Sequence, residues 1–137
     1  MKTIVSWKGN MAFEGETPRG NKVLMDASAK AGGEDRGPSP MEAVLMTIGG
    51  CTGIDVLGIL EKMRLDVTDL KVEIEGDRAE DHPRVFNKLN MVYKVWGKDL
   101  PEDKIKRAVE LTQEKYCSVL HMVNKTAKVT YTYEINP

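Results

Sequence analysis

The stretch SPMEAVLMTIGGCTGIDVLGILEKMRL, residues 39–65, is the most apolar part of the chain and decides its fold. Ser39 followed by Pro40 is typical of a helix start, because serine caps the first turn and proline suits the first helical position. We therefore predict one helix that runs from Ser39 to about Arg64. This helix carries a cysteine, Cys51, and four glycines: Gly49, Gly50, Gly53 and Gly58.

The glycines need a structural reason, because each glycine inside a helix costs about 1 kcal/mol relative to alanine. Several in one helix indicate that another backbone approaches closely, or that the helix is broken near Gly49 and Gly50. Apolar residues also lie nearly all round this helix, which is typical of a helix buried on every side. One sheet in a chain of 137 residues hardly surrounds such a helix. We therefore expect a homodimer in which the Cys51 helices of the two subunits are central.

The rest of the chain alternates between strand and helix patterns. Strands are predicted at 3–8, 11–13, 22–26, 70–77, 84–97 and 127–135, and a second, amphipathic helix at 101–116. Met91, Tyr93 and Val95 share one face of their strand, which indicates a half-buried strand. The order of strands, helix, two strands, helix and strand predicts an α+β fold with a mostly antiparallel sheet. We expect a single domain over residues 1–137.

Composition narrows the classes of partner. The net charge is −1, from 20 basic and 21 acidic residues, and gives no electrostatic reason to expect nucleic acid or an anionic membrane. Charged residues interrupt the long apolar stretch, which argues against a membrane span. The apolar run in MKTIVSWKGN is too short for a signal peptide. We expect a cytoplasmic protein, in which cysteines are thiols or form transient disulfides.

The chain has two cysteines, Cys51 and Cys117, and the residues alone leave two interpretations open. Both could be buried thiols that pack as small hydrophobes. They could instead form a redox pair, in which one thiolate attacks a peroxide and becomes a sulfenic acid, and the other thiol condenses with it to a disulfide. The redox pair requires two cysteines that are distant in sequence and adjacent in the fold.

A metal site and a Cys–His hydrolase are less well supported. His121 lies four residues after Cys117, so that these two and Cys51 are three possible soft ligands. The spacing matches no standard zinc pattern, structural zinc normally has four ligands, and the other histidine is His82. A hydrolase would also need a partner that orients His121, and nothing marks one. We expect no metal.

A reactive thiol needs a nearby cation or a helix N-terminus to favour its thiolate. Arg36, just before the long helix, is the first candidate for that cation, and Arg19 and Arg78 are weaker ones. Asp55 lies one turn after Cys51, where an unpaired carboxylate would disfavour the thiolate. We therefore expect Asp55 to be paired with a cation or a hydrogen-bond donor.

Glu42 is a second candidate residue of the site. It precedes Cys51 by nine residues, which corresponds to about 900° and therefore to opposite faces of an ideal helix. Glu42 reaches the thiol only if the chain departs from regular helix near Gly49 and Gly50, or if it acts on the site of a partner subunit.

The segments SPMEAVLMTIGGCTGIDVLGIL and EKYCSV together resemble the OsmC/Ohr family of thiol-dependent hydroperoxide reductases, and most closely its OsmC-like branch. Both cysteines have matching flanks at a matching separation, and the resemblance extends from VSWKGNMAFEGE to the last strand. It implies an intertwined α+β dimer whose sheets wrap two central helices.

The resemblance also implies roles for individual residues. Cys51 matches the peroxidatic cysteine of the family and Cys117 the resolving cysteine. The family's glutamate directly follows the proline, where this chain has Met41, and Glu42 comes one place later. The family's arginine lies in an N-terminal hairpin, where this chain offers only Lys8, and Arg36 is the candidate substitute.

By this resemblance the protein is a cytoplasmic antioxidant enzyme that reduces organic hydroperoxides. An external dithiol would restore the two cysteines, and neither metal, flavin nor nucleotide would be needed. The shifted glutamate and the missing hairpin arginine motivate an alternative, a dimer that binds a small ligand without useful peroxidase activity.

Overall fold

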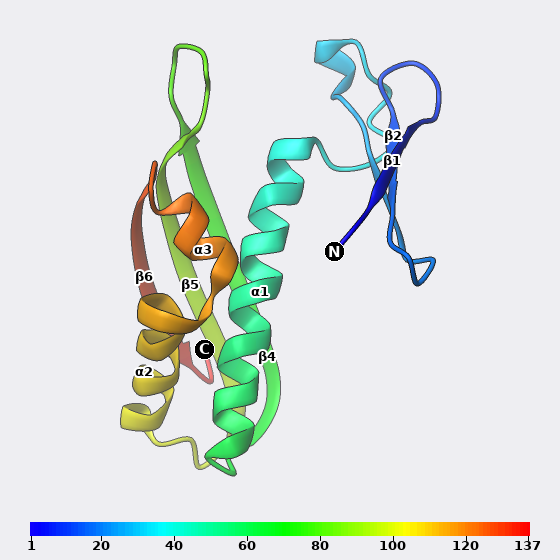
Figure 1. The fold of residues 1–137 in the computed structure, drawn as a ribbon. Coiled ribbons are helices and arrows are strands. Elements are labelled where there is room, and N and C mark those ends of the chain that lie inside the picture. The colour runs from blue at the N-terminus through cyan, green and yellow to red at the C-terminus, as the bar shows by residue number, and fades with distance from the viewer. The chain divides into compact units, whose positions relative to one another are not determined.

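The computed structural model describes residues 1–137 and divides into two compact units, Met1–Met46 and Thr47–Pro137, each described here by itself (Figure 1). In chain order, the elements are β1 (Ile4–Trp7), β2 (Phe13–Glu16), β3 (Lys22–Met25), the short 3-10 helix η1 (Ala29–Ala31), α1 (Pro40–Lys62), β4 (Asp66–Arg78), β5 (Phe86–Lys98), α2 (Glu102–Leu111), the π-helical turn η2 (Thr112–Tyr116), α3 (Ser118–Val123) and β6 (Lys128–Ile135).

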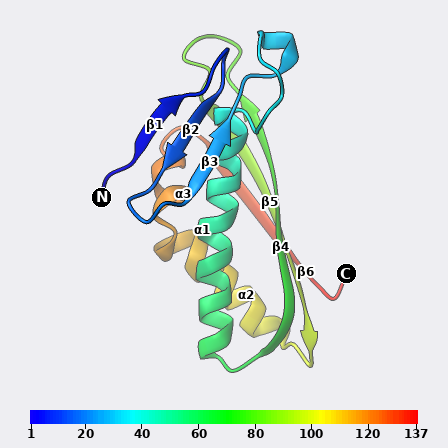
Figure 2. The same ribbon diagram turned by 90° about the vertical axis from the view of Figure 1, so that its right-hand side faces the viewer.

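The first unit contains an antiparallel sheet in the order β1-β2-β3 (Figure 2). Gly9 and Asn10 turn the chain between β1 and β2 with positive φ angles of 95° and 45°. The indole Nε1 of Trp7 donates a hydrogen bond to the carbonyl of Asn10 (2.8 Å) and fixes this turn. The strands predicted at 3–8 and 22–26 are confirmed. The strand predicted at 11–13 is misplaced, because β2 begins only at Phe13 and residues 11–12 complete the turn that follows β1.

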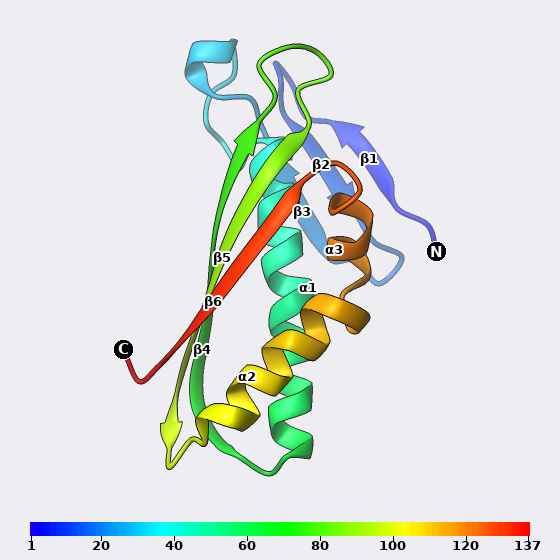
Figure 3. The same cartoon turned by 90° about the vertical axis from the view of Figure 1, so that its left-hand side faces the viewer.

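The second unit contains a sheet in the order β4-β5-β6, with α2 and α3 on the same side of it as α1 (Figure 3). Strands β4 and β5 are antiparallel, whereas β5 and β6 are parallel. Parallel neighbours need a long crossover connection. Here α2, η2 and α3 form that connection. The prediction of an α+β fold with mostly antiparallel pairing is correct, although the strands form two sheets and one pair is parallel.

The core of the second unit lies between its sheet and its helices. Met91, Tyr93 and Val95 of β5 are fully buried, as their alternation predicts. The helices contribute further apolar, fully buried side chains: Ile48, Val56 and Leu60 of α1, and Ile105, Ala108 and Val109 of α2. Strand β5, the middle strand of this sheet, therefore contributes the centre of the core.

Of the two explanations given for the glycines, the break near Gly49 and Gly50 is wrong, because α1 is one continuous helix. A Cβ added to Gly49 would lie 3.2 Å from Ile74 Cδ1, and one on Gly53 would lie 3.7 Å from Val72 Cγ2. The first distance is tight and the second is an ordinary van der Waals contact, so that Gly49, and not Gly53, lets α1 approach β4 closely. Close packing of the helix on its own sheet explains Gly49 without any break in the backbone.

The other sides of α1 are less covered. Nothing lies within 4 Å of a Cβ built on Gly50 or Gly58, and the side chain of Ile54 is 74% exposed. An 18-residue window of this helix has a mean hydropathy of 1.8, so by length and composition α1 could cross a membrane. Core helices share these properties, and α1 buries one of its faces in the second unit.

Candidate functional site

Two cysteines and one carboxylate meet in the second unit. Cys51 lies in the middle of α1 and is partly exposed, whereas Cys117 lies between η2 and α3 and is fully buried. Both are free thiols. The two Sγ atoms and a carboxylate oxygen of Asp55 all lie within 4.8 Å of one another. The fold therefore brings together the two cysteines that the sequence singled out.

The backbone around Cys117 explains how its sulfur is positioned. The wide turn η2 is closed by a hydrogen bond from Cys117 N to the carbonyl of Thr112 (3.2 Å). Cys117 then adopts an extended conformation and caps α3, where its Sγ accepts a hydrogen bond from Leu120 N (3.4 Å). A cysteine in place of the usual serine or aspartate cap thus directs its sulfur inward.

Burial is the main cause that raises the pKa of Cys117 to about 11. A hydrogen bond with the side chain of Cys51 and the charge of Cys51 raise this pKa as well, while the backbone N–H groups of Leu120 and Val119 lower it. Because the resulting value lies far above neutral pH, Cys117 is a protonated thiol at neutral pH. The two sulfurs are close enough for the state of one to affect the other.

Asp55 is the charged residue next to both sulfurs. It lies one helical turn after Cys51, as the sequence indicates, and its Oδ2 atom is buried without a hydrogen-bond partner. No ion pair is formed by Asp55 with a lysine, arginine or histidine. The sequence argument required a cation or a hydrogen bond for this carboxylate, and the structure leaves one of its oxygens with neither.

Sequence reasoning missed the polar groups buried beside this pair. Gln113 Nε2 donates a hydrogen bond to Tyr93 Oη (2.6 Å), and Thr112 Oγ1 is buried without a partner. Burial raises the pKa of Tyr93 to about 12, against the hydrogen bonds of Thr52 and Gln113, and the charge of Cys117 raises it further. The one available signal was a tyrosine on the inward face of a strand, since a buried tyrosine hydroxyl usually finds a partner.

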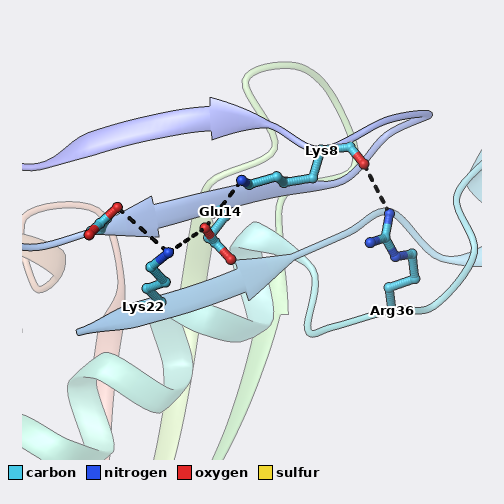
Figure 4. Close-up of polar contacts among 5 residues, drawn as sticks. Lys8, Glu14, Lys22 and Arg36 are labelled. Carbon is cyan, nitrogen blue, oxygen red and sulfur yellow. Dashed lines mark hydrogen bonds and ion pairs between the residues drawn. The ribbon is translucent and has the colours of Figure 1, made fainter. Parts of the chain in front are cut away.

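Arg36 belongs to the first unit, where its guanidinium contacts the N-terminal hairpin (Figure 4). Its Nη1 donates a hydrogen bond to the backbone carbonyl of Lys8 (3.2 Å), and its backbone N donates to Asp26 Oδ2 (3.2 Å). The ammonium of Lys8 forms an ion pair with Glu14 (3.4 Å). The N-terminal hairpin, which has no arginine of its own near Lys8, is thus contacted by Arg36 from a later loop.

Glu42 forms part of the start of α1. Its Oε2 accepts hydrogen bonds from Ser39 N (2.7 Å) and Ser39 Oγ (2.8 Å), and Glu42 N donates to Ser39 Oγ (3.3 Å). This reciprocal arrangement is a capping box. These hydrogen bonds lower the pKa of Glu42, and the bond from the backbone N of Ser39 has a larger effect than the bond from its hydroxyl. The helix start predicted at Ser39 is confirmed, and the roles of Arg36 and Glu42 toward Cys51 stay predictions.

The metal alternative considered above combined the cysteines with His121. The structure places Asp55, and not His121, in the cluster with the two sulfurs. His121 lies on α3, and its Nε2 is buried without a hydrogen-bond partner. Of the weaker candidate cations, Arg78 donates its Nε hydrogen to the carbonyl of Arg84 (2.7 Å).

Comparison with known proteins shows the family to which this chain belongs. The family described as OsmC-like protein matches residues 32–132, a range that contains both cysteines. This chain belongs to the OsmC family. The predicted family is therefore confirmed, and the two cysteines with their flanking residues were a sufficient signal for it.

Relatives of this OsmC family member cover its whole length. It is 43% identical to Protein YhfA of Escherichia coli K12 over 135 residues, which are 98% of each chain. A structure of a hypothetical protein from Aquifex aeolicus VF5 superimposes with a TM-score of 0.87 at 32% identity, over 98% of this chain and 95% of that one.

A more distant structure has a name that states a function. The organic hydroperoxide resistance protein OhrB of Bacillus subtilis superimposes with a TM-score of 0.64 at 16% identity, over 98% of both chains. At that identity the likeness shows the shared fold alone. The chain has the α+β fold of the OsmC and Ohr proteins, and this fold includes hydroperoxide resistance proteins.

Proposed function

We propose that this OsmC family member is a cytoplasmic thiol-dependent peroxidase that reduces organic hydroperoxides. The observation that carries the proposal is the pair of free thiols in the second unit, one partly exposed and one buried, whose sulfurs lie within 4.8 Å. A pair of this kind suits a cycle in which a peroxide reaches one thiol and the other closes a disulfide. The shared fold with hydroperoxide resistance proteins supports the same chemistry.

The first half of the cycle takes place at Cys51. Its thiolate attacks one peroxide oxygen, the O–O bond breaks, and Cys51 becomes a sulfenic acid while the departing alkoxide takes a proton and leaves as an alcohol. Cys51 is the cysteine that meets the peroxide, because its side chain is partly exposed while that of Cys117 is fully buried.

The second half of the cycle takes place between the two sulfurs. Cys117 attacks the sulfur of Cys51, the S–S bond forms and the S–O bond breaks, and the proton of Cys117 leaves with the hydroxyl group as water. Burial, the main cause that raises the pKa of Cys117, is unchanged in this step, whereas reduced Cys51 raises it further by a hydrogen bond or by its charge, and this contribution ends when Cys51 becomes a sulfenic acid. Oxidation of the first cysteine therefore makes the second one easier to deprotonate.

An external dithiol then restores both thiols by two exchange steps. The cycle uses no metal, flavin or nucleotide. The exposed apolar side chains of α1 near Cys51, among them Ile54, favour an alkyl hydroperoxide over hydrogen peroxide.

We assign Arg36 as the cation that favours the Cys51 thiolate, and Glu42 as its carboxylate partner. What supports Arg36 is its hydrogen bond to Lys8 of the hairpin, since the family's arginine lies in that hairpin. What supports Glu42 is its place in the capping box at the start of α1, close in sequence to the position of the family's glutamate.

One equivalent of hydroperoxide tests the proposal directly. We expect reduced protein mixed with one equivalent of cumene hydroperoxide to lose both free thiols, gain an intramolecular disulfide and release one equivalent of alcohol. Thiol titration, intact mass and chromatography of the alcohol measure the three products. If the thiols survive an excess of hydroperoxide in folded protein, a dimer that binds small ligands becomes the better interpretation.

The homodimer stays part of the proposal. Large apolar side chains are exposed in each unit, such as Trp7 at 65% and Met122 at 65%, and a second subunit would cover side chains of this kind. We expect light scattering at micromolar concentration to give twice the mass of one chain, 15.3 kDa. A stable monomer at that concentration would contradict the dimer.

A further inference from the structure

The two sulfurs and the carboxylate of Asp55 form a set of three donors, and the peroxide cycle gives no role to Asp55. Cys51 and Asp55 lie one turn apart on α1, and Cys117 lies before α3. One donor atom from each lies within 4.8 Å of the other two. Two thiols and a carboxylate converge from two elements on one point in the second unit.

The state of Asp55 indicates that this point lacks a positive group. Its Oδ2 atom is buried with no hydrogen-bond partner, and no basic side chain forms an ion pair with the carboxylate. A buried acceptor without a partner destabilises the folded protein, and does so more strongly when it is charged. Deprotonation of either thiol would add negative charge at the same place. A cation held by all three groups would remove both costs.

The donor types select the cation. Thiolate sulfur suits Zn²⁺ and other soft or borderline ions, whereas Mg²⁺ and Ca²⁺ take oxygen ligands in sets of six or more. Zinc binds sulfur at about 2.3 Å and carboxylate oxygen at about 2.0–2.2 Å, so that its ligand atoms lie roughly 3.5–3.8 Å apart in a tetrahedron. Donor atoms that already lie within 4.8 Å need only small side-chain movements to reach that geometry.

We propose that the reduced protein binds one zinc ion per chain through Cys51 Sγ, Asp55 and Cys117 Sγ, with water at the fourth position. On binding, each thiol loses its proton to the solvent, and the two thiolates and the carboxylate balance the charge of the ion with one negative charge in excess. The disulfide form has no thiolates and does not bind the ion. Zinc and peroxide therefore compete for the same two sulfurs.

Cadmium is the probe for the first test, because bound thiolates give it an ultraviolet charge-transfer band. Wild-type protein is titrated with Cd²⁺ without oxygen, once reduced and once with the intramolecular disulfide formed by diamide and checked by mass. We expect the band to saturate at one ion per reduced chain and to be absent from the oxidised chain. Equal binding by both forms, or no binding by the reduced form, would overturn the proposal. This comparison needs no variant.

Asp55→Asn tests the carboxylate, because asparagine keeps the size of the side chain and removes its charge. Competition with a coloured chelator measures the affinity for Zn²⁺. Mutation of a residue that only orients a metal ligand typically lowers metal affinity about 10- to 100-fold. Because Asp55 is proposed as a ligand itself, we expect Asp55→Asn to lower the affinity for Zn²⁺ at least about tenfold. Glu61→Gln, on the exposed side of the same helix, is the matched control and should bind as wild type does. Unchanged affinity in folded Asp55→Asn would overturn the three-ligand site.

These outcomes are separate from those of the peroxidase proposal, because no peroxide is present. Protein that binds one Zn²⁺ but leaves cumene hydroperoxide intact would contradict the peroxidase alone. Protein that consumes the hydroperoxide but binds no Cd²⁺ would contradict the metal site alone.

Discussion

Cys51→Ser abolishes the consumption of cumene hydroperoxide in the presence of a small dithiol. The expected loss is at least about a thousandfold, because removal of the nucleophile removes the step itself and leaves only substrate binding. Serine keeps the size of the side chain, and Cys51 is only partly buried, so we expect the fold to be unchanged. The measurement is the rate of hydroperoxide loss at several dithiol concentrations, with circular dichroism to check folding.

The graded control for this experiment is Arg36→Met. It removes a cation and leaves both thiols, so we expect slower but measurable turnover. Arg36→Lys should recover part of the rate at neutral pH. If Cys51→Ser consumed hydroperoxide as fast as wild type, the assignment of Cys51 would be wrong.

Cys117→Ser allows one turnover and then stops. Its Cys51 still reacts with hydroperoxide and yields one equivalent of alcohol, but no second thiol is available within the chain to form the disulfide. We expect a trapped sulfenic acid, detectable with a dimedone probe, and a steady-state rate in dithiol close to background. A burst of alcohol equal to the protein concentration is the measurement that distinguishes this variant from Cys51→Ser.

The burial of Cys117 requires a check on folding for this variant, because serine would place a hydroxyl group where a thiol is fully buried. Cys117→Ala removes the thiol without adding a hydroxyl group and should behave in the same way. Normal cycling by both folded variants would show that Cys117 is not the resolving cysteine.

Much of the second unit follows from local patterns in the sequence. The alternation through Met91, Tyr93 and Val95 predicts which face of β5 is buried, because side chains alternate strictly along a strand. Ser39 and Pro40 predict the start of α1 to within one residue, since the helix begins at Pro40. Both signals depend on residues that are close in sequence, and the tertiary packing of this unit is consistent with the local structure that they predict.

The features that sequence reasoning missed depend on contacts between distant segments. The turn η2 and the six-residue helix α3 have no usual capping residue, because the cap of α3 is Cys117 itself. The tight fit that favours glycine at position 49 depends on Ile74, which lies in another element. The convergence of Asp55 and Cys117 depends on the parallel pairing of β5 with β6, which returns the chain to the side of α1.

The unequal burial of the two sulfurs also has a consequence for the return half of the cycle. An incoming dithiol attacks the more accessible sulfur of the disulfide, that of Cys51, and Cys117 is then the leaving group. A thiol with a raised pKa leaves slowly in such an exchange, and burial, the main cause that raises the pKa of Cys117, persists when Cys51 is oxidised. We therefore expect reduction by the dithiol, and not the reaction with peroxide, to limit the rate, so that the protein accumulates as the disulfide whenever hydroperoxide is plentiful.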